Sequence, residues 1–288
     1  MTMIRLALAC AMLAGTATPV LADGWDAPQE PFAIYGNTYY VGPHGVSSVL
    51  ITSPQGHILI DGGSPESPKA IAAHIGQLGF KIKDVKYILN SHEHYDHAGG
   101  IAELQKWSGA TVLTGRAGAT VLSTGRTNPA DPQFTNLPPT MAPVAKVRAL
   151  ADNEVVSLGP LRVTAHYTPG HTQGGMSWTW QSAEGGKVAN MVYADSLTAY
   201  ANKPFRYSGS PSWPQARAEL ERSIELVASL PCDIVISAHP EYSGLWERKA
   251  AADMQGHAGF IDTAGCRNYA AKGQAGLAEV VEEESASK

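Results

Sequence analysis

Short apolar runs alternate with amphipathic stretches along most of the chain, and clusters of glycine and proline separate them. Apolar runs of about four to eight residues are typical of buried strands, whereas apolar positions three or four residues apart are typical of helices. The pattern predicts strands in residues 46–53, 57–63, 85–90, 110–115, 146–151, 161–170, 176–182, 190–197 and 232–240. It predicts helices in residues 67–80, 98–107, 213–230 and 246–256, followed by a polar tail.

The first predicted helix carries residue types that favour a helix start. Ser67 has the residue type of an N-cap, and Pro68 follows at the first helical position, where a missing N–H is tolerated. A proline-rich stretch without any period, residues 125–144, is predicted to be a surface loop, and loops of this length are often functional. Because no linker divides the alternating strands and helices, we expect one compact α/β domain.

The beginning of the chain has the pattern of an export signal. Residues 1–22 hold one cation, Arg5, then an apolar stretch and a final VLA, which predicts cleavage at their end. The apolar stretch is too short and too weakly flanked for a transmembrane helix. Cys10 loosely resembles a lipoprotein cysteine, but it comes early and lacks the usual apolar residue three positions before it. We therefore expect a periplasmic mature domain, residues 23–288, without a membrane anchor.

Composition and charge narrow the class of partner. The chain is 44% hydrophobic and 16% charged, which is enough apolar material for a substantial core. Its net charge is −5, and loss of the one arginine in residues 1–22 would make it −5 − 1 = −6. A negative chain without a polybasic run gives no reason to expect nucleic-acid binding. We expect a monomer.

Two cysteines remain in the expected mature chain, Cys232 and Cys266. An even number of cysteines in an exported chain favours a disulfide, and two buried free thiols are the alternative. Such a bridge would fasten the C-terminal helical segment to the body of the domain.

Three of the 10 histidines lie within six residues, in the sequence SHEHYDHAGG that begins at Ser91. His92 and His94 are two residues apart, so both rings point the same way from an extended segment. Asp96 and His97 follow as the chain turns into the next helix. One tetrahedral zinc site with an open position needs three protein ligands.

Two further histidines end predicted strands beside glycine or proline, and they complete two such sites. His171 follows residues 161–170, and His239 ends residues 232–240. The carboxyl ends of strands are where ligands collect in α/β folds. The remaining histidines are expected to be structural or solvated: His44, His57, His74, His166 and His257. Glu93 and Tyr95 alternate with the expected ligands and are expected to point away from the metals.

These motifs, together with DGG, TPGHT, YADS and SAHP, resemble the metallo-β-lactamase superfamily, and most closely its subclass B3. The resemblance covers about residues 30–270 and implies a four-layer αββα sandwich, with α/β topology and two Zn²⁺ ions at one edge. It implies a first zinc on His92, His94 and His171, and a second on Asp96, His97 and His239. Subclass B1 enzymes use a cysteine in the second site, and Ser196 stands at that position here. Cys232 and Cys266 match a disulfide of subclass B3.

The resemblance also implies the reaction, which is hydrolysis of the β-lactam amide bond of penicillins, cephalosporins or carbapenems, and so antibiotic resistance. Two zinc ions bring +4 and only Asp96 among the six ligands is anionic, so about +3 would remain to generate a bridging hydroxide and attract an anionic β-lactam. Asp96 would orient that hydroxide and is the expected catalytic residue. Expected substrate contacts are Ser196, Thr198 and Gln173. Residues 128–139 and an apolar stretch near Trp25 are expected to wall the pocket.

Three rival hypotheses remain open, of which a metal-dependent phosphodiesterase of the same fold is the weakest. Thioester and lactone hydrolases of the same fold share the H-x-H-x-D-H motif but use an aspartate that bridges both metals, and Asp195 could fill that position. A zinc-storage module is the non-enzymatic rival. Glycines on either side of the expected ligands favour open coordination, and therefore catalysis.

Overall fold

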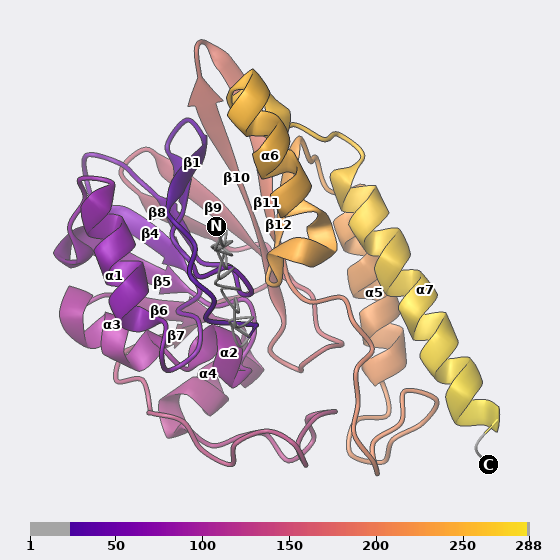
Figure 1. Ribbon diagram of the computed structural model, residues 1–288. Helices are drawn as coiled ribbons and strands as arrows, with labels where there is room; N and C mark the ends of the chain where they lie inside the picture. Colours follow the sequence, from indigo (N-terminus) through magenta and orange to yellow (C-terminus); the bar gives the residue numbers. More distant parts are fainter. Residues whose placement is uncertain (1–23, 287–288) are drawn as a thin grey trace, which may run out of the picture.

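The computed structural model describes residues 24–286, in which two β-sheets lie face to face between two outer layers of helices (Figure 1). The first sheet has the strand order β1 (Phe32–Tyr35), β2 (Thr38–Tyr40), β3 (Val49–Ile51), β4 (His57–Ile60), β5 (Val85–Leu89), β6 (Thr111–Thr114) and β7 (Val147–Ala149). Its strands pair antiparallel from β1 to β4 and parallel from β4 to β7.

The second sheet is mostly antiparallel. Its strand order is β12 (Ile234–Ser237), β11 (Lys187–Ala194), β10 (Met176–Glu184), β9 (Leu161–Tyr167) and β8 (Val155–Leu158). Only β11 and β12 pair in parallel, so the carboxyl ends of both point to the same edge of the sheet.

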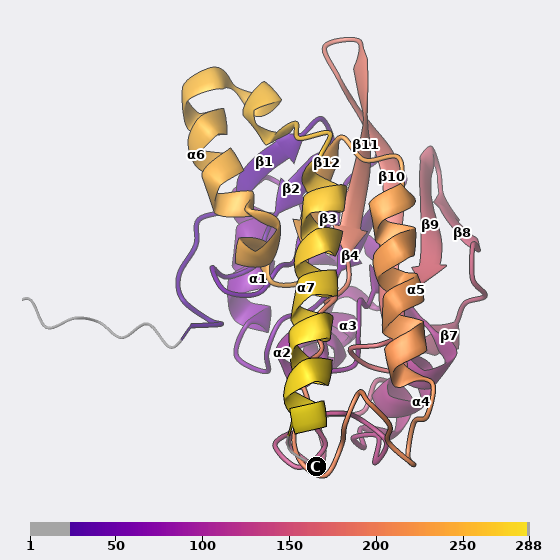
Figure 2. The same ribbon diagram turned by 90° about the vertical axis from the view of Figure 1, so that its right-hand side faces the viewer.

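Helices cover the outer face of each sheet, as Figures 1 and 2 show. The outer face of the first sheet is covered by α1 (Pro68–Gln77), α2 (Tyr95–Ala98), α3 (Ile101–Ser108) and α4 (Arg116–Thr124). The second sheet is covered by α5 (Ala216–Ser229) and α7 (Gly265–Ala286), and α6 (Leu245–Gln255) lies beside them. Three short 3-10 helices complete the chain: η1 (Ile82–Asp84), η2 (Pro240–Ser243) and η3 (His257–Phe260).

Alternating side chains divide the apolar residues into three buried clusters. In β4, Ile58 and Ile60 face the second sheet, where they join the cluster that contains Trp178. Leu59 points the other way, into the cluster with α1 and α3. A third cluster joins the second sheet to α5 and α7. The three clusters account for the four layers, and the predicted αββα sandwich is confirmed.

The strands and helices predicted between residues 46 and 256 are confirmed, and the prediction differs from the structure in three respects. The Ser67 hydroxyl does not cap α1; it donates a hydrogen bond to the Asp26 carboxylate, at 2.5 Å. The strands β1, β2 and β8 and the helix α4 were not predicted. The predicted polar tail is wrong, because residues Gly265–Ala286 form the longest helix of the described chain. Its buried side is rich in glycine and alanine, so the buried and exposed sides of the helix differ little in hydrophobicity.

The predicted disulfide between Cys232 and Cys266 is confirmed. It joins the residues just before β12 to the first turn of α7. Among the described residues, no helix is long and apolar enough to cross a membrane.

Replacing Cys232 and Cys266 with serine should lower the free energy of unfolding by about 2–4 kcal/mol, because the bridge closes a long loop in the unfolded chain. The bridge lies at the amino end of β12, whereas His239 follows its carboxyl end. Urea unfolding should therefore show the loss, while the zinc content of the folded variant should equal that of wild type. A variant with unchanged unfolding free energy would contradict the stabilising role.

Candidate metal centre

The His-rich loop that follows β5 is built around the buried carboxylate of Asp61. Asp61 follows β4 and has a left-handed backbone, with φ of 61°, which is uncommon for a residue other than glycine. Its Oδ1 accepts hydrogen bonds from the Ser91 N–H at 2.7 Å and from the Asn90 side chain at 3.0 Å. Its Oδ2 accepts from the Ser91 hydroxyl at 2.6 Å and from Tyr193 of the second sheet at 2.7 Å. These bonds fix the start of the loop before the first histidine.

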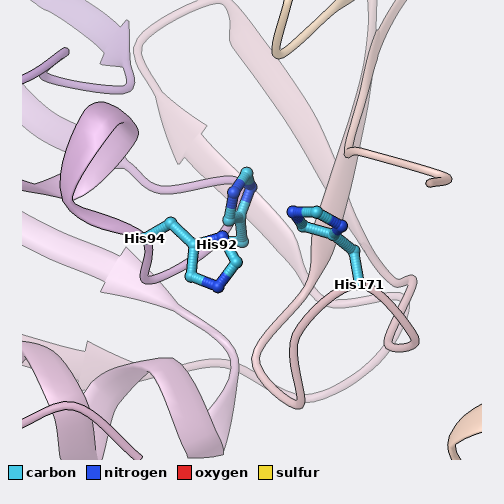
Figure 3. Close-up of side chains that lie close together, drawn as sticks. All are labelled: His92, His94 and His171. Carbon is cyan, nitrogen blue, oxygen red and sulfur yellow. The ribbon is translucent and has the colours of Figure 1, made fainter. Parts of the chain in front are cut away.

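His92, His94 and His171 face one another across the edge of the two sheets (Figure 3). Their ring centroids form a nearly equilateral triangle with sides of 4.9, 4.9 and 5.0 Å. All three rings are buried, and one nitrogen of each lies within 4.8 Å of a nitrogen on the other two. This geometry suits a single tetrahedral cation better than three separate hydrogen bonds.

The opposite nitrogen of each ring is held by an oxygen of the protein. The three hydrogen bonds are His92 Nδ1 to Asp195 Oδ1 at 2.8 Å, His94 Nε2 to Asp131 Oδ2 at 3.0 Å, and His171 Nδ1 to the Thr198 carbonyl at 2.9 Å. Such partners set the tautomer of a metal-ligating imidazole and the direction of its free lone pair. Here they leave His92 Nε2 and His94 Nδ1 free to face a common ion, together with His171 Nε2, which lies 3.3 Å from Gln133 Nε2.

A second cluster lies beside the first and contains Asp96, His97 and His239. Asp96 Oδ2 is 3.1 Å from His97 Nε2 and 3.4 Å from His239 Nε2. The two Nε2 atoms are 3.2 Å apart, while His239 Nδ1 lies 3.1 Å from the Gly45 carbonyl. His92, Asp96 and His97 also satisfy the spacing of a three-ligand site, so the two clusters adjoin at His92.

Burial and mutual repulsion favour the neutral form of His92 and His171, whereas the carboxylates of Asp131 and Asp96 outweigh burial and raise the pKa of His94 and of His239. Burial and the neighbouring imidazoles hold the pKa of His92 well below its usual range, and burial followed by His94 lowers the pKa of His171 to about 3. Burial raises the pKa of Asp96, but contacts with His97 and His239 outweigh it and bring that pKa well below its usual range. Neutral imidazoles and an ionised carboxylate are the forms that bind a metal.

The donor set fits zinc. His92 Nε2 is buried and has no hydrogen-bond partner, although buried polar atoms nearly always have one. A cation at the centre of the ring triangle would satisfy it. Imidazole nitrogens with one carboxylate are ligands that zinc accepts readily. The six residues predicted as ligands are therefore brought together in the structure, in two adjacent groups of three.

The predicted substrate contacts lie in different places. Thr198 lines the cleft above the metal centre. Ser196 is buried and is not part of the cleft lining. Gln173 also lies outside the lining, where its Oε1 accepts a hydrogen bond from Asn128 at 2.7 Å.

The cleft has a volume of about 1050 Å³, and its floor includes His94, Asp96, His171 and His239. Its walls include Trp25 from the N-terminal stretch and Gln133 and Leu137 from the long loop, so both predicted walls are confirmed. Gln133 reaches the cluster itself, because its Nε2 is 3.3 Å from His171 Nε2.

Comparison with known proteins agrees with this geometry. The model of the metallo-β-lactamase superfamily matches residues 41–239. The crystal structure of MEM-A1, a subclass B3 metallo-β-lactamase isolated from a soil metagenome library, is 62% identical, with a TM-score of 0.90 over 92% of this chain and 100% of that one. The Rm3 metallo-β-lactamase is 50% identical, with a TM-score of 0.90 over 92% of this chain and 98% of that one.

The chain belongs to subclass B3 of the metallo-β-lactamase superfamily. More distant relatives lie outside subclass B3: a hydroxyacylglutathione hydrolase of Pseudomonas paraeruginosa is 28% identical over 54% of this chain and 47% of its own length. The matched regions span between 30% and 61% of the first curated relatives.

In this subclass B3 member, Asp195 lies behind His92 rather than between the two clusters. Its Oδ1 bonds His92 Nδ1, the nitrogen directed away from the triangle centre. It belongs to neither of the two ligand groups found among the described residues. Burial raises the pKa of Asp195 well above its usual range. The geometry makes it an orienting partner of His92.

Glu93 was expected to point away from the metals, and the structure gives it a definite position. Its buried carboxylate accepts hydrogen bonds from the Thr172 hydroxyl at 2.8 Å and from the Gly174 N–H at 3.2 Å. A side chain at Gly174 would lie 2.3 Å from Glu93 Oε2, so glycine is required there. Glu93 thus fastens the loop of His92 and His94 to the loop of His171. Sequence spacing gives no signal for this contact between positions 93 and 172.

Thr172→Val should lower the affinity for zinc by roughly 10- to 100-fold, because it removes the hydroxyl that holds Glu93 while keeping the shape of the side chain. A competitive titration against a chelator measures this affinity. Thr172→Ser, which keeps the hydroxyl, is the matched control and should bind zinc as wild type does. The melting temperature of the metal-free proteins checks that both variants fold. Equal zinc affinity in the valine variant would show that the contact does not position the ligands.

Proposed function

We propose that this protein hydrolyses the amide bond of β-lactam antibiotics with the help of two zinc ions. The observation that carries the proposal is the pair of adjacent three-residue clusters, of which His94, Asp96, His171 and His239 line an open cleft. His92, His94 and His171 would hold the first zinc, and Asp96, His97 and His239 the second. When bound, the two ions would supply a water that ionises near neutral pH and a Lewis acid for the lactam carbonyl.

The protein itself contributes orientation and charge. Asp96 stays ionised because its pKa lies well below the usual range, so its carboxylate can both bind zinc and orient the attacking water. Thr198 lines the cleft and serves as a hydrogen-bonding contact for the substrate. Ser196 and Gln173 are not part of the cleft lining. We assign them the role of supporting the residues that contact the substrate.

We further propose that the protein acts in the periplasm as a monomer. The expected signal peptide, residues 1–22, lies outside the described residues. Trp25, close behind the expected cleavage position, already forms part of the cleft wall. The disulfide between Cys232 and Cys266 supports an oxidising compartment. The mature chain would be the single domain of residues 23–288.

Thioester hydrolysis is the second candidate, because curated relatives include hydroxyacylglutathione hydrolases. Under the thioester-hydrolase hypothesis, Asp195 would bridge the two metals. The hydrogen bond of Asp195 to the outer nitrogen of His92 favours β-lactam hydrolysis instead.

The zinc-loaded protein should hydrolyse a carbapenem, and a strong chelator should abolish the activity, because the proposed reaction depends on the metal ions that the six residues would hold. The decrease in lactam absorbance measures the reaction. Added zinc should restore the activity after chelation. An S-acyl glutathione thioester serves as the comparison substrate. Turnover of the thioester alone would favour the second candidate over the first.

Asp96→Asn should leave a folded protein whose kcat is lower by orders of magnitude, because an amide is a poor ligand for zinc and a poor acceptor for the attacking water. Steady-state kinetics and zinc content are measured together. Asp253→Asn, at an exposed salt bridge with Lys249, is the matched control and should keep wild-type turnover. Near-wild-type turnover in the Asp96 variant would refute its assigned role.

A further inference from the structure

The cleft continues well beyond the metal ligands, towards α7. Ligand sites of about 300–1000 Å³ are typical for small molecules, and this cleft reaches the upper end of that range. The middle of α7 forms one wall, which includes Lys272, Gly276 and Val280. A β-lactam nucleus that reacts at the clusters would leave this side of the cleft for a substituent.

Helix α7 is attached to the loop that supports the metal centre. The Tyr269 hydroxyl donates a hydrogen bond to the Asp195 carbonyl at 2.8 Å and accepts one from the Leu197 N–H at 3.3 Å. The next turn of α7 packs tightly on the same loop, because a side chain at Gly273 would lie 2.8 Å from the Leu197 carbonyl. The α7 wall is therefore fixed relative to His92, whose partner is Asp195.

Exposed aromatic rings surround the cleft. Trp25 is 40% exposed, Tyr200 57% and Tyr242 44%, and all three line it. The Tyr242 ring lies 5.7 Å from the His239 ring and the Trp25 ring 6.4 Å from it, so the aromatic side chains begin directly at the second cluster. A cluster of exposed apolar rings in a concave surface marks a binding site.

Gly276 leaves open space on the α7 wall. Glycine inside a helix is unfavourable by about 1 kcal/mol relative to alanine. Close packing against Leu197 explains Gly273, but at Gly276 no atom lies within 4 Å of the position a side chain would take. Packing within the protein therefore does not require a glycine at 276, and the free space belongs to the cleft.

Charges on this wall disfavour an anionic ligand group. Lys272 is the only lysine or arginine that lines the cleft within the described chain, and its ammonium already donates to the Tyr242 carbonyl at 3.0 Å. Glu241 and Glu279 line the cleft as well and would repel an anion. Val280, one helical turn after Gly276, lines the cleft, as does Leu197, which packs against Gly273.

We propose that the α7 side of the cleft, formed by Leu197, Tyr200, Gly276 and Val280, is a subsite for a neutral aromatic acyl substituent of the substrate. This inference rests on the proposed β-lactam hydrolysis. The subsite increases affinity for substrates with a large acyl group and leaves the reaction at the metal centre unchanged.

The test uses Gly276→Leu, which fills the open space, and two penicillins that differ only in the acyl group. One carries a phenylacetyl group, and the other, 6-aminopenicillanic acid, carries none. Gly276→Leu should raise KM for the phenylacetyl compound at least tenfold, while kcat/KM for the nucleus should stay within twofold of wild type. Ala275→Leu, at an exposed position outside the cleft on the same helix, is the control and should change neither value.

Each outcome decides the proposal. Unchanged kinetics with both compounds would show that the acyl group binds elsewhere, and an equal loss with both would show damage to the metal centre; either result overturns the subsite. If zinc-loaded wild type cleaves neither compound, the proposed function fails, and calorimetric titration with the same two compounds then tests the subsite. Tenfold weaker binding of the phenylacetyl compound to Gly276→Leu would support it, and equal binding would overturn it.

Discussion

One buried carboxylate, that of Asp61, holds the two sheets and the His-rich loop in a single arrangement. A buried carboxylate is tolerable only when hydrogen bonds replace the lost water, and Asp61 has donors from Asn90, Ser91 and Tyr193. The first two donors follow β5 in the first sheet, whereas Tyr193 lies on β11 in the second. Satisfying this charge therefore brings the carboxyl ends of strands from both sheets together, and the metal ligands follow those strand ends.

The sequence was sufficient to predict which six residues the structure brings together, because most of them are close in the chain. Four of the six lie between His92 and His97, and His171 and His239 each end a strand at a glycine or proline. The alternating apolar runs predicted one compact α/β domain, and the family resemblance implied the sandwich. Helix α7 was missed because small residues fill its buried side, so hydrophobic contrast is weak where close packing decides the structure.

The partners that orient the ligands could not be predicted, since they are distant in sequence. Asp131 lies 37 residues from His94, in a long loop without any periodic pattern, and Thr172 lies 79 residues from Glu93. The docking of the second sheet on the first brings Thr172 to Glu93, whereas the path of the loop between α4 and β7 brings Asp131 to His94. The same docking separates Asp195 from the metal side of His92, a distinction that its residue type and position in the chain do not reveal.

Because His92 follows a strand of the first sheet and His171 and His239 follow strands of the second, the ligand set exists only when both sheets are assembled. A metal that binds the folded chain and not the unfolded one adds its binding free energy to stability, in proportion to the logarithm of its concentration. Folding and metal binding therefore form one linked equilibrium. The resistance of this protein to unfolding and proteolysis would then rise and fall with the free zinc around it.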